Sequence, residues 1–259
     1  TMERLSTGKR INSAADDAAG LAIATKMTSQ IRGLDQAGRN ANNATSMIQL
    51  ADGSAEQISN ILQRMREIVV QAADGSNSVS DVAVLDVEFK EAAEEIDRIV
   101  DSTEFNGKKL LDGNAGGTAD SSVTFQIGAN ATQTLEVDFS DFNLAAGTTT
   151  TPMGADLSSY TTTGMGTDYD ATLNALDTAI EGVATQRATF GATMNRLEYA
   201  VDNLASSSLA TATARGRIED ANYATETTSL ARTQIIQQAG TAMLAQANQK
   251  AQSVLSLLQ

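Results

Sequence analysis

The residues of this chain that could do chemistry are its carboxylates, because the sequence contains neither cysteine nor histidine. This absence excludes thiolate and imidazole nucleophiles, histidine-based triads, and metal sites built from histidine or cysteine. Two adjacent carboxylate pairs, Asp16 with Asp17 and Glu94 with Glu95, remain as acid and base candidates. Neighbouring residues on a helix point about 100° apart, so neither pair shares a face. We therefore expect solvated charges, with no catalytic residue, metal site, cofactor or enzymatic activity.

A second group of polar residues stands in the stretch NILQRMREIVVQAADG, residues 60–75. Arg64 and Glu67 are three positions apart, which on a helix permits an ion pair worth about 0.3 kcal/mol. Arg64 is also four positions from Ile68, so the two would be neighbours on the helix surface. An arginine beside an apolar side chain has the character of an interface anchor. These charges belong either to a solvated face or to a binding surface.

This stretch is part of a long run in which apolar residues alternate at spacings of three and four. Such spacing keeps side chains on one stripe when helices wrap around each other. It predicts a helix over residues 43–73, about 45 Å long. The turn residues DGSNS that follow should end it. The stripe consists of Leu34, Ala37, Ala41, Ala44, Ile48, Ala51, Ala55, Ile58, Leu62, Met65, Val69 and Ala72.

A second helix is predicted to follow and to end near Ser102. Ser80 is its expected cap, and Asp81 would lie at the positive end of the helix dipole. The segment EFNGKKLLDG after this helix is predicted to be turn and loop. The stripe of this helix consists of Val82, Leu85, Phe89, Ala92, Ile96 and Ile99.

The middle of the chain has a different pattern, in which apolar and polar residues alternate strictly. Two such runs around the segment GANATQ predict a β-hairpin. The following residues 140–170 are rich in Thr, Gly and Asp and predict an irregular surface excursion. The alternating apolar residues are Val123, Phe125 and Ile127 in the first run, and Leu135, Val137 and Phe139 in the second.

The heptad pattern returns after residue 170 and predicts a long third helix, whose stripe is interrupted by Arg187 alone before it turns polar at Ser208. Residues 229–259 form a further amphipathic stretch with a broad apolar arc. Such a terminal helix is either an interaction element or packs against its own chain. The stripe of the third helix consists of Leu173, Leu176, Ile180, Val183, Arg187, Phe190, Met194, Leu197, Val201 and Leu204.

Composition agrees with a helical protein of this kind. Aromatic residues make up only 4% of the chain and there is a single proline, which suits long helices packed through small side chains. The net charge of −14 disfavours nucleic acid and anionic lipid as partners. No window approaches the roughly 20 apolar residues of a membrane span, and no secretory leader opens the chain. Thr1 is not an initiator methionine, so we expect a truncated or processed chain.

The predicted fold class is therefore mainly α, an elongated bundle of long heptad-patterned helices with a β-hairpin and a small irregular β-rich insertion. We expect six regions along the chain: a connecting region (1–42), the first part of a helical rod domain (43–120), its hairpin (121–139), a variable excursion (140–170), the returning helix (171–218) and a carboxy-terminal polymerisation region (219–259). Within the first region, Ser13 and Asp16 predict a capping-box-like helix start.

Long motifs at both ends resemble those of bacterial flagellin, the subunit of the flagellar filament. The amino-terminal ones are ERLSTGKRINSAADDAAGLAIA, GLDQAGRNANNATSMIQLADGSAEQISNILQRMREIVVQAADG, EEIDRIVDSTEFNGKKLL and FQIGAN. The carboxy-terminal one is RIEDANYATETTSLARTQIIQQAGTAMLAQANQKAQSVLSLLQ. The chain departs from the family in lacking the usual amino-terminal segment and in having a much reduced variable region.

The resemblance implies a structural protein that assembles with other flagellin subunits in the extracellular filament and serves motility. It also implies two further partners, a flagellin-specific export chaperone and the flagellin-sensing Toll-like receptor of vertebrates. Receptor contacts would be Gln63, Arg64, Ile68 and Glu88, although Leu stands in place of Ile68 in many flagellins. The residues implied for polymerisation or chaperone binding are Ile235, Ile236, Met243, Leu244, Ala247, Val254, Leu255 and Leu258.

Two other readings stay open at this stage. The chain could be a flagellin homologue that binds polysaccharide at the cell surface, through hydroxyl and carboxylate groups of its excursion. It could also be a hook-filament junction protein, which shares the terminal helices. A zinc peptidase of the kind that some flagellins carry is excluded, because that motif requires histidine.

Overall fold

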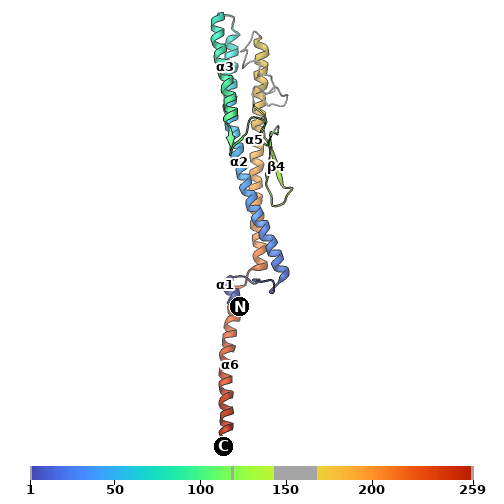
Figure 1. Cartoon of the computed structure of the whole chain (residues 1–259), viewed down its shortest axis with the longest axis vertical. Coiled ribbons are helices and arrows are strands. Elements are labelled where there is room, and N and C mark those ends of the chain that lie inside the picture. Colours follow the sequence, from blue (N-terminus) through green and yellow to red (C-terminus); the bar gives the residue numbers. More distant parts are fainter. Residues whose placement is uncertain (1, 118–119, 143–167, 258–259) are drawn as a thin grey trace. The chain divides into compact units, whose positions relative to one another are not determined.

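The computed structural model describes residues 2–117, 120–142 and 168–257, with side-chain burial described as far as residue 247 (Figure 1). Helices account for most of these residues, which confirms the predicted mainly α fold. The elements in chain order are α1 (Met2–Thr7), α2 (Ala18–Ala72), α3 (Val79–Ser102), β1 (Glu104–Phe105), β2 (Lys108–Lys109), β3 (Ser122–Gln126), β4 (Thr134–Asp138), α5 (Tyr169–Glu219) and α6 (Tyr223–Leu257).

Two compact units share these elements. The terminal unit comprises residues 1–32 and 207–259, and the central unit comprises residues 33–206. Helices α2 and α5 contribute residues to both. The six sequence regions proposed above remain predictions. Across the part of the chain described, no helix is both long enough and apolar enough to cross a bilayer.

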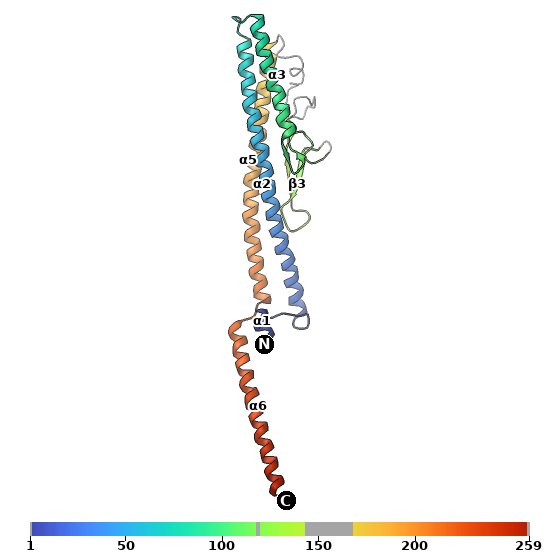
Figure 2. The ribbon, with the colours of Figure 1, turned by 60° about the vertical axis from the view of Figure 1, so that its left-hand side comes forward.

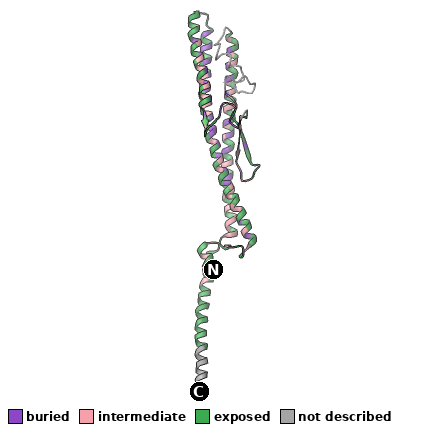
Figure 3. Ribbon diagram, in the orientation of Figure 1, coloured by how far each residue is buried: buried purple, intermediate pink, exposed green. Residues whose placement is uncertain are grey.

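In the central unit, α2, α3 and α5 pack side by side around one apolar core (Figures 1 and 2). All members of the predicted α2 stripe are buried, and Figure 3 shows buried residues recurring along the helices. Ala41, Ala44, Ala51 and Ala55 are each 0% exposed. A methyl group allows neighbouring elements to approach closely, so a thin core can be dense without many large rings.

The members of the predicted stripe on α5 are not all buried to the same extent. Every second member of its predicted stripe is buried, namely Leu176, Val183, Phe190, Leu197 and Leu204, while the members between them are half-buried. In α3 the buried positions include Ala93 and Val100, whereas the predicted Ala92 and Ile99 are half-buried. The heptad therefore identified each buried face, but not which member of a stripe lies deepest.

Arg187, the polar interruption of the α5 stripe, is explained by its partners on α2. Its Nε donates a hydrogen bond to Asp52 Oδ1 at 2.9 Å, and its Nη2 lies 3.4 Å from Glu56 Oε2. The hydrogen bond with Asp52 is the main cause that raises the pKa of Arg187. A charged side chain within an apolar stripe favours one register between two helices, because a slipped register would leave it unpaired.

The predicted β-hairpin is confirmed. Strands β3 and β4 are antiparallel, with Val123 opposite Val137 and Phe125 opposite Leu135. The hairpin lies alongside α5 in Figure 1, and the side-chain amide of Gln186 on α5 donates to Asp138 O at 2.7 Å. Phe139, just after β4, is buried, and its ring centroid lies 5.8 Å from that of Phe190 on α5. This aromatic pair fastens the hairpin to the helical core.

A second, smaller hairpin lies in the segment predicted to be turn and loop. Strands β1 and β2 pair Glu104 with Lys109 and Phe105 with Lys108. The two residues between them, Asn106 and Gly107, have φ angles of 54° and 77°. Positive φ at both central positions is what a tight hairpin turn requires, and Asn-Gly adopts it readily.

Three predicted helix starts need correction. The first long helix begins at Ala18 rather than near residue 43, and the backbone N–H of Gly20 donates to Asp17 Oδ1 at 2.8 Å. Ser13 and Asp16 form a turn before it, so their hydrogen bonds cap no helix. The N-cap of α3 is Ser78 rather than Ser80, and Ser78 forms a reciprocal capping box with Asp81.

For α3 the reason is the spacing of the capping box: Asp81 stands three positions after Ser78, whereas the residue three positions after Ser80 is Ala83. The irregular excursion predicted at residues 140–170 falls mostly outside the described residues. Its described ends are Phe142, which is buried, and the first turn of α5.

Candidate functional site

The polar patch predicted on the first long helix forms a three-residue ion network. Arg64 on α2 donates from Nε and Nη2 to Glu88 Oε1 on α3, at 3.0 and 2.6 Å. Its Nη1 donates to Glu67 Oε2 at 3.0 Å. Hydrogen bonds with Glu88 and then Glu67 raise the pKa of Arg64. The sequence argument identified the pair with Glu67 but missed the bridge between the two helices.

Of the four residues implied for receptor contact, three lie together at the surface. Gln63, Arg64 and Glu88 are exposed, whereas Ile68 is 0% exposed and belongs to the core. Spacing along α2 made Ile68 a neighbour of Arg64, but it could not show that α3 returns against this part of the helix. We call Gln63, Arg64 and Glu88 the α2–α3 patch.

Exposed valines accompany the α2–α3 patch. Val84 and Val87 on α3 are 71% and 58% exposed, and Val70 on α2 is 50% exposed. Val84 lies one helical turn from Glu88, so the two share a surface. Sequence reasoning assigned no role to these valines. The signal for Val84 and Val87 was their position next to the α3 stripe, where the core does not require an apolar residue.

Helix α6 presents an apolar surface that nothing in the described structure covers. Residues 231–247 are all exposed, as Figure 3 shows. Ile235, Ile236, Met243 and Leu244 are between 62% and 72% exposed, and Ala247 is exposed with them. Val254 and Leu255 belong to α6, but their side chains lie outside the described part, as does the whole of Leu258. We call Ile235, Ile236, Met243, Leu244 and Ala247 the α6 face.

The start of α6 is held by residues 5–10, which we call the strap. The backbone N–H of Arg10 donates to Glu219 O at 2.7 Å, and its guanidinium donates to Ile218 O at 2.7 Å. The N–H of Ala221 donates to Gly8 O, and the hydroxyl of Tyr223 donates to Leu5 O. The strap thus satisfies carbonyls that the end of α5 leaves unpaired.

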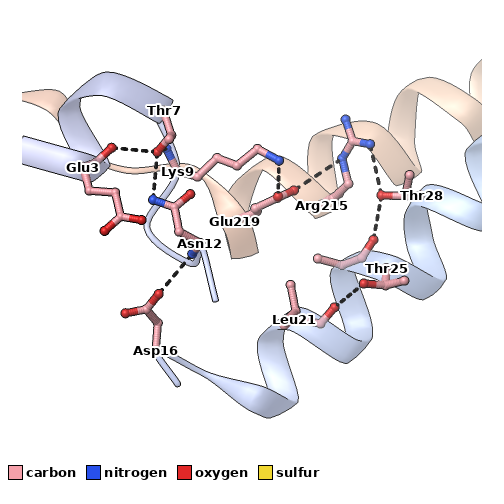
Figure 4. Close-up of polar contacts among 11 residues, drawn as sticks. Glu3, Thr7, Lys9, Asn12, Asp16, Leu21, Thr25, Thr28, Arg215 and Glu219 are labelled. Carbon is pink, nitrogen blue, oxygen red and sulfur yellow. Dashed lines mark hydrogen bonds and ion pairs between the residues drawn. The ribbon is translucent and has the colours of Figure 1, made fainter. Parts of the chain in front are cut away.

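Beside the strap, a chain of polar contacts joins α5 to α2 within the terminal unit (Figure 4). Lys9 and Arg215 both approach the carboxylate of Glu219, the second at 4.0 Å. Arg215 also donates to the hydroxyl of Thr28 at 3.2 Å. An open groove of about 380 Å³ follows these contacts, lined by Leu21, Ala24, Thr25, Thr28, Ser29, Arg32 and Glu219. We call it the Arg32 groove.

None of these surfaces has the composition of a metal site or of a catalytic centre. Across the residues that the structure describes, no group of three carboxylates could hold a metal ion. Asp16 and Asp17 are used in separate local hydrogen bonds, to the turn at Ser13 and to Gly20. Hydrogen bonds from Ser13 lower the pKa of Asp16.

Comparison with protein families matches both ends of the chain. The model for the bacterial flagellin N-terminal helical region matches residues 1–116, and that for the bacterial flagellin C-terminal helical region matches residues 173–258. The flagellin of Halalkalibacterium halodurans is 44% identical over 99% of this chain and 90% of that protein. The flagellin of Bacillus subtilis is 41% identical over 99% of this chain and 91% of that protein.

Solved structures agree with these relationships. The flagellin of Bacillus cereus is 31% identical, with a TM-score of 0.50 over 64% of this chain and 88% of that one. A flagellar hook-associated protein of Vibrio parahaemolyticus has a TM-score of 0.63 over 79% of this chain and 100% of that one, but at 17% identity it shows the fold alone. Helical regions at both ends and whole-chain relatives lead to one conclusion: this chain belongs to the bacterial flagellin family and is a structural subunit of the flagellar filament.

Proposed function

We propose that this subunit joins neighbouring subunits of the secreted filament through the α6 face. The observation that carries the proposal is the exposure of four large apolar side chains, between 62% and 72%, on one helix. Burying each of them would contribute about 1.5–3 kcal/mol. Part of that gain would offset the entropy lost when a terminal helix becomes ordered on binding. Val254, Leu255 and Leu258 extend the proposed contact by their sequence positions.

The same face gives a reason for a carrier before assembly. A subunit that is exported through the channel of the flagellum must not associate through exposed apolar residues inside the cell. Capture by a flagellin-specific export chaperone would cover these side chains until export. The chaperone and the neighbouring subunit would then compete for the α6 face, and each would exclude the other.

Introducing charge on the α6 face tests this proposal. The double substitution Ile236→Asp with Met243→Asp is expected to abolish filaments in the producing bacterium, because two carboxylates would have to be buried without partners. Filaments are counted by electron microscopy, and chaperone capture is measured by co-purification. The matched control is Gln238→Asp with Ala245→Asp, which adds the same charge two residues further along in each case. Normal filaments from the Ile236/Met243 variant would refute the role of the α6 face.

We also propose that the free subunit is a ligand of the flagellin-sensing Toll-like receptor, through the α2–α3 patch. The specific support is the geometry of Arg64, which carboxylates on two helices hold in one orientation at an exposed position. A pre-oriented guanidinium loses little entropy on binding, which suits an interface anchor. Ile68 would contribute from beneath, by holding α2 in place.

The receptor proposal predicts that Arg64→Ala reduces signalling potency at least about ten-fold, as expected for the loss of an anchor. Potency is measured with purified protein on reporter cells that express the receptor. Arg196→Ala is a suitable control, because Arg196 is an exposed arginine on α5 that is distant in sequence from the patch. Equal potency of the Arg64 variant and the unmodified protein would count against the patch.

A further inference from the structure

Charge is divided very unevenly between the two units. The terminal unit contains nine basic residues (Lys and Arg) and six acidic residues (Asp and Glu). The central unit contains nine basic residues and twenty-six acidic residues. The chain is strongly acidic as a whole, yet its terminal unit carries an excess of three positive charges. The terminal unit of one copy and the central unit of another therefore carry net charges of opposite sign, which attract each other locally.

The lining of the Arg32 groove contains one basic residue, Arg32, and one acidic residue, Glu219. Thr25, Thr28 and Arg32 follow each other at spacings of three and four, so they share one face of α2. The hydroxyls of Thr25 and Thr28 already donate to carbonyls of their own helix, at Leu21 and Ala24. Glu219, the acidic residue of the lining, is approached by both Lys9 and Arg215.

Arg32 is exposed and has no hydrogen bond or ion pair with any other residue in the described ranges. It therefore differs from Arg64, Arg66 and Arg187, each of which is paired with a carboxylate. The groove thus offers two donors to an acidic partner, the guanidinium of Arg32 and the hydroxyl of Ser29.

Grooves of the central unit have the opposite character. One of about 270 Å³ between α2 and α5 is lined by Glu198 and Asp202 and by no basic residue. Another, of about 410 Å³, includes Glu104 and again no basic residue. The surfaces of one chain are therefore complementary in charge to those of a second copy.

We propose that the Arg32 groove docks on the acidic central unit of a second copy, as a self-contact additional to the α6 face. Because two different surfaces meet, the contact is heterologous, and such contacts can continue from copy to copy along a helical assembly. This inference rests on the charge distribution and on the groove, and it does not depend on the α6 face. A second copy is the partner favoured here, since subunits of a filament are surrounded by one another.

Charge reversal tests the contact. Self-association of the purified chain is measured by sedimentation velocity at about 0.02 M and about 0.3 M sodium chloride, because screening at the higher salt should dissociate an electrostatic contact. Arg32→Glu is expected to weaken association at low salt about five-fold. The matched control is Arg196→Glu, the same substitution at an exposed arginine of the acidic central unit. It should not weaken association, although the net charge of the chain changes equally.

Three results would overturn the proposal. One is equal weakening of self-association by Arg32→Glu and Arg196→Glu, which would show that the effect comes from the total charge of the chain. Another is the absence of salt-dependent association in the unmodified chain. The third is a stronger effect of inorganic phosphate than of chloride at equal ionic strength, which would assign the groove to a small oxyanion.

A final comparison separates this contact from that of the α6 face. In the Ile236→Asp, Met243→Asp background, salt-dependent association should persist and should still be weakened by Arg32→Glu. Its loss in that background would overturn the independent contact and leave the α6 proposal standing. If the Ile236→Asp, Met243→Asp variant forms filaments and Arg32→Glu still weakens association, the α6 proposal fails and the contact of the Arg32 groove stands.

Discussion

Phe190→Ala is expected to lower the free energy of unfolding of the chain by about 3–5 kcal/mol. Phe190 is 0% exposed, and its ring packs against Phe139, which follows the hairpin. Removing the ring would leave a cavity between α5 and the hairpin, because the close-packed side chains around it can relax only partly into the space. The measurement is urea denaturation followed by circular dichroism.

Tyr199→Ala is the matched control for this large effect. Tyr199 is an aromatic residue of the same helix, but it is 75% exposed. Its removal should change the unfolding free energy by no more than about 0.5 kcal/mol. Similar losses for the two substitutions would mean that the Phe139–Phe190 contact does not hold the hairpin to the core.

Ile68→Ala is expected to cost about 2–4 kcal/mol of unfolding free energy, because Ile68 is completely buried within the core of α2, α3 and α5. The matched control is Val70→Ala, which removes apolar atoms two residues further along at a position that is 50% exposed. That control should cost less than about 1 kcal/mol. Both values come from urea denaturation.

The same substitution separates a receptor contact from a supporting residue. If Ile68 acts only by holding α2 in place, the folded Ile68→Ala protein should signal within about three-fold of the unmodified chain, whereas Arg64→Ala should lose about ten-fold or more. Arg64 lies at the surface, so its removal should leave the urea midpoint nearly unchanged. A folded Ile68→Ala protein with the full loss of potency would show that Ile68 is itself in contact with the receptor.

The mainly α fold and its buried faces followed directly from the sequence. A spacing of three and four fixes which side chains share a stripe, whatever the helix packs against, and the twelve predicted members of the α2 stripe are all buried. Strict alternation likewise predicted the hairpin, and the absence of cysteine and histidine removed most classes of catalytic and metal site. The apolar arc of α6 was also visible in the sequence, but the sequence left open whether this helix is an interaction element or packs against its own chain.

Tertiary structure decided what depends on a second element. Ile68 is buried because α3 returns against α2, and the same return brings Glu88 to Arg64 from 24 residues away. Arg187 fits an apolar stripe only because Asp52 and Glu56 face it from α2. Local spacing describes one helix at a time, whereas burial and charge pairing are properties of two. For that reason the sequence alone predicted the stripes, but not which charged residues of different helices meet, nor that Arg32 has no ion pair within the described part of the chain.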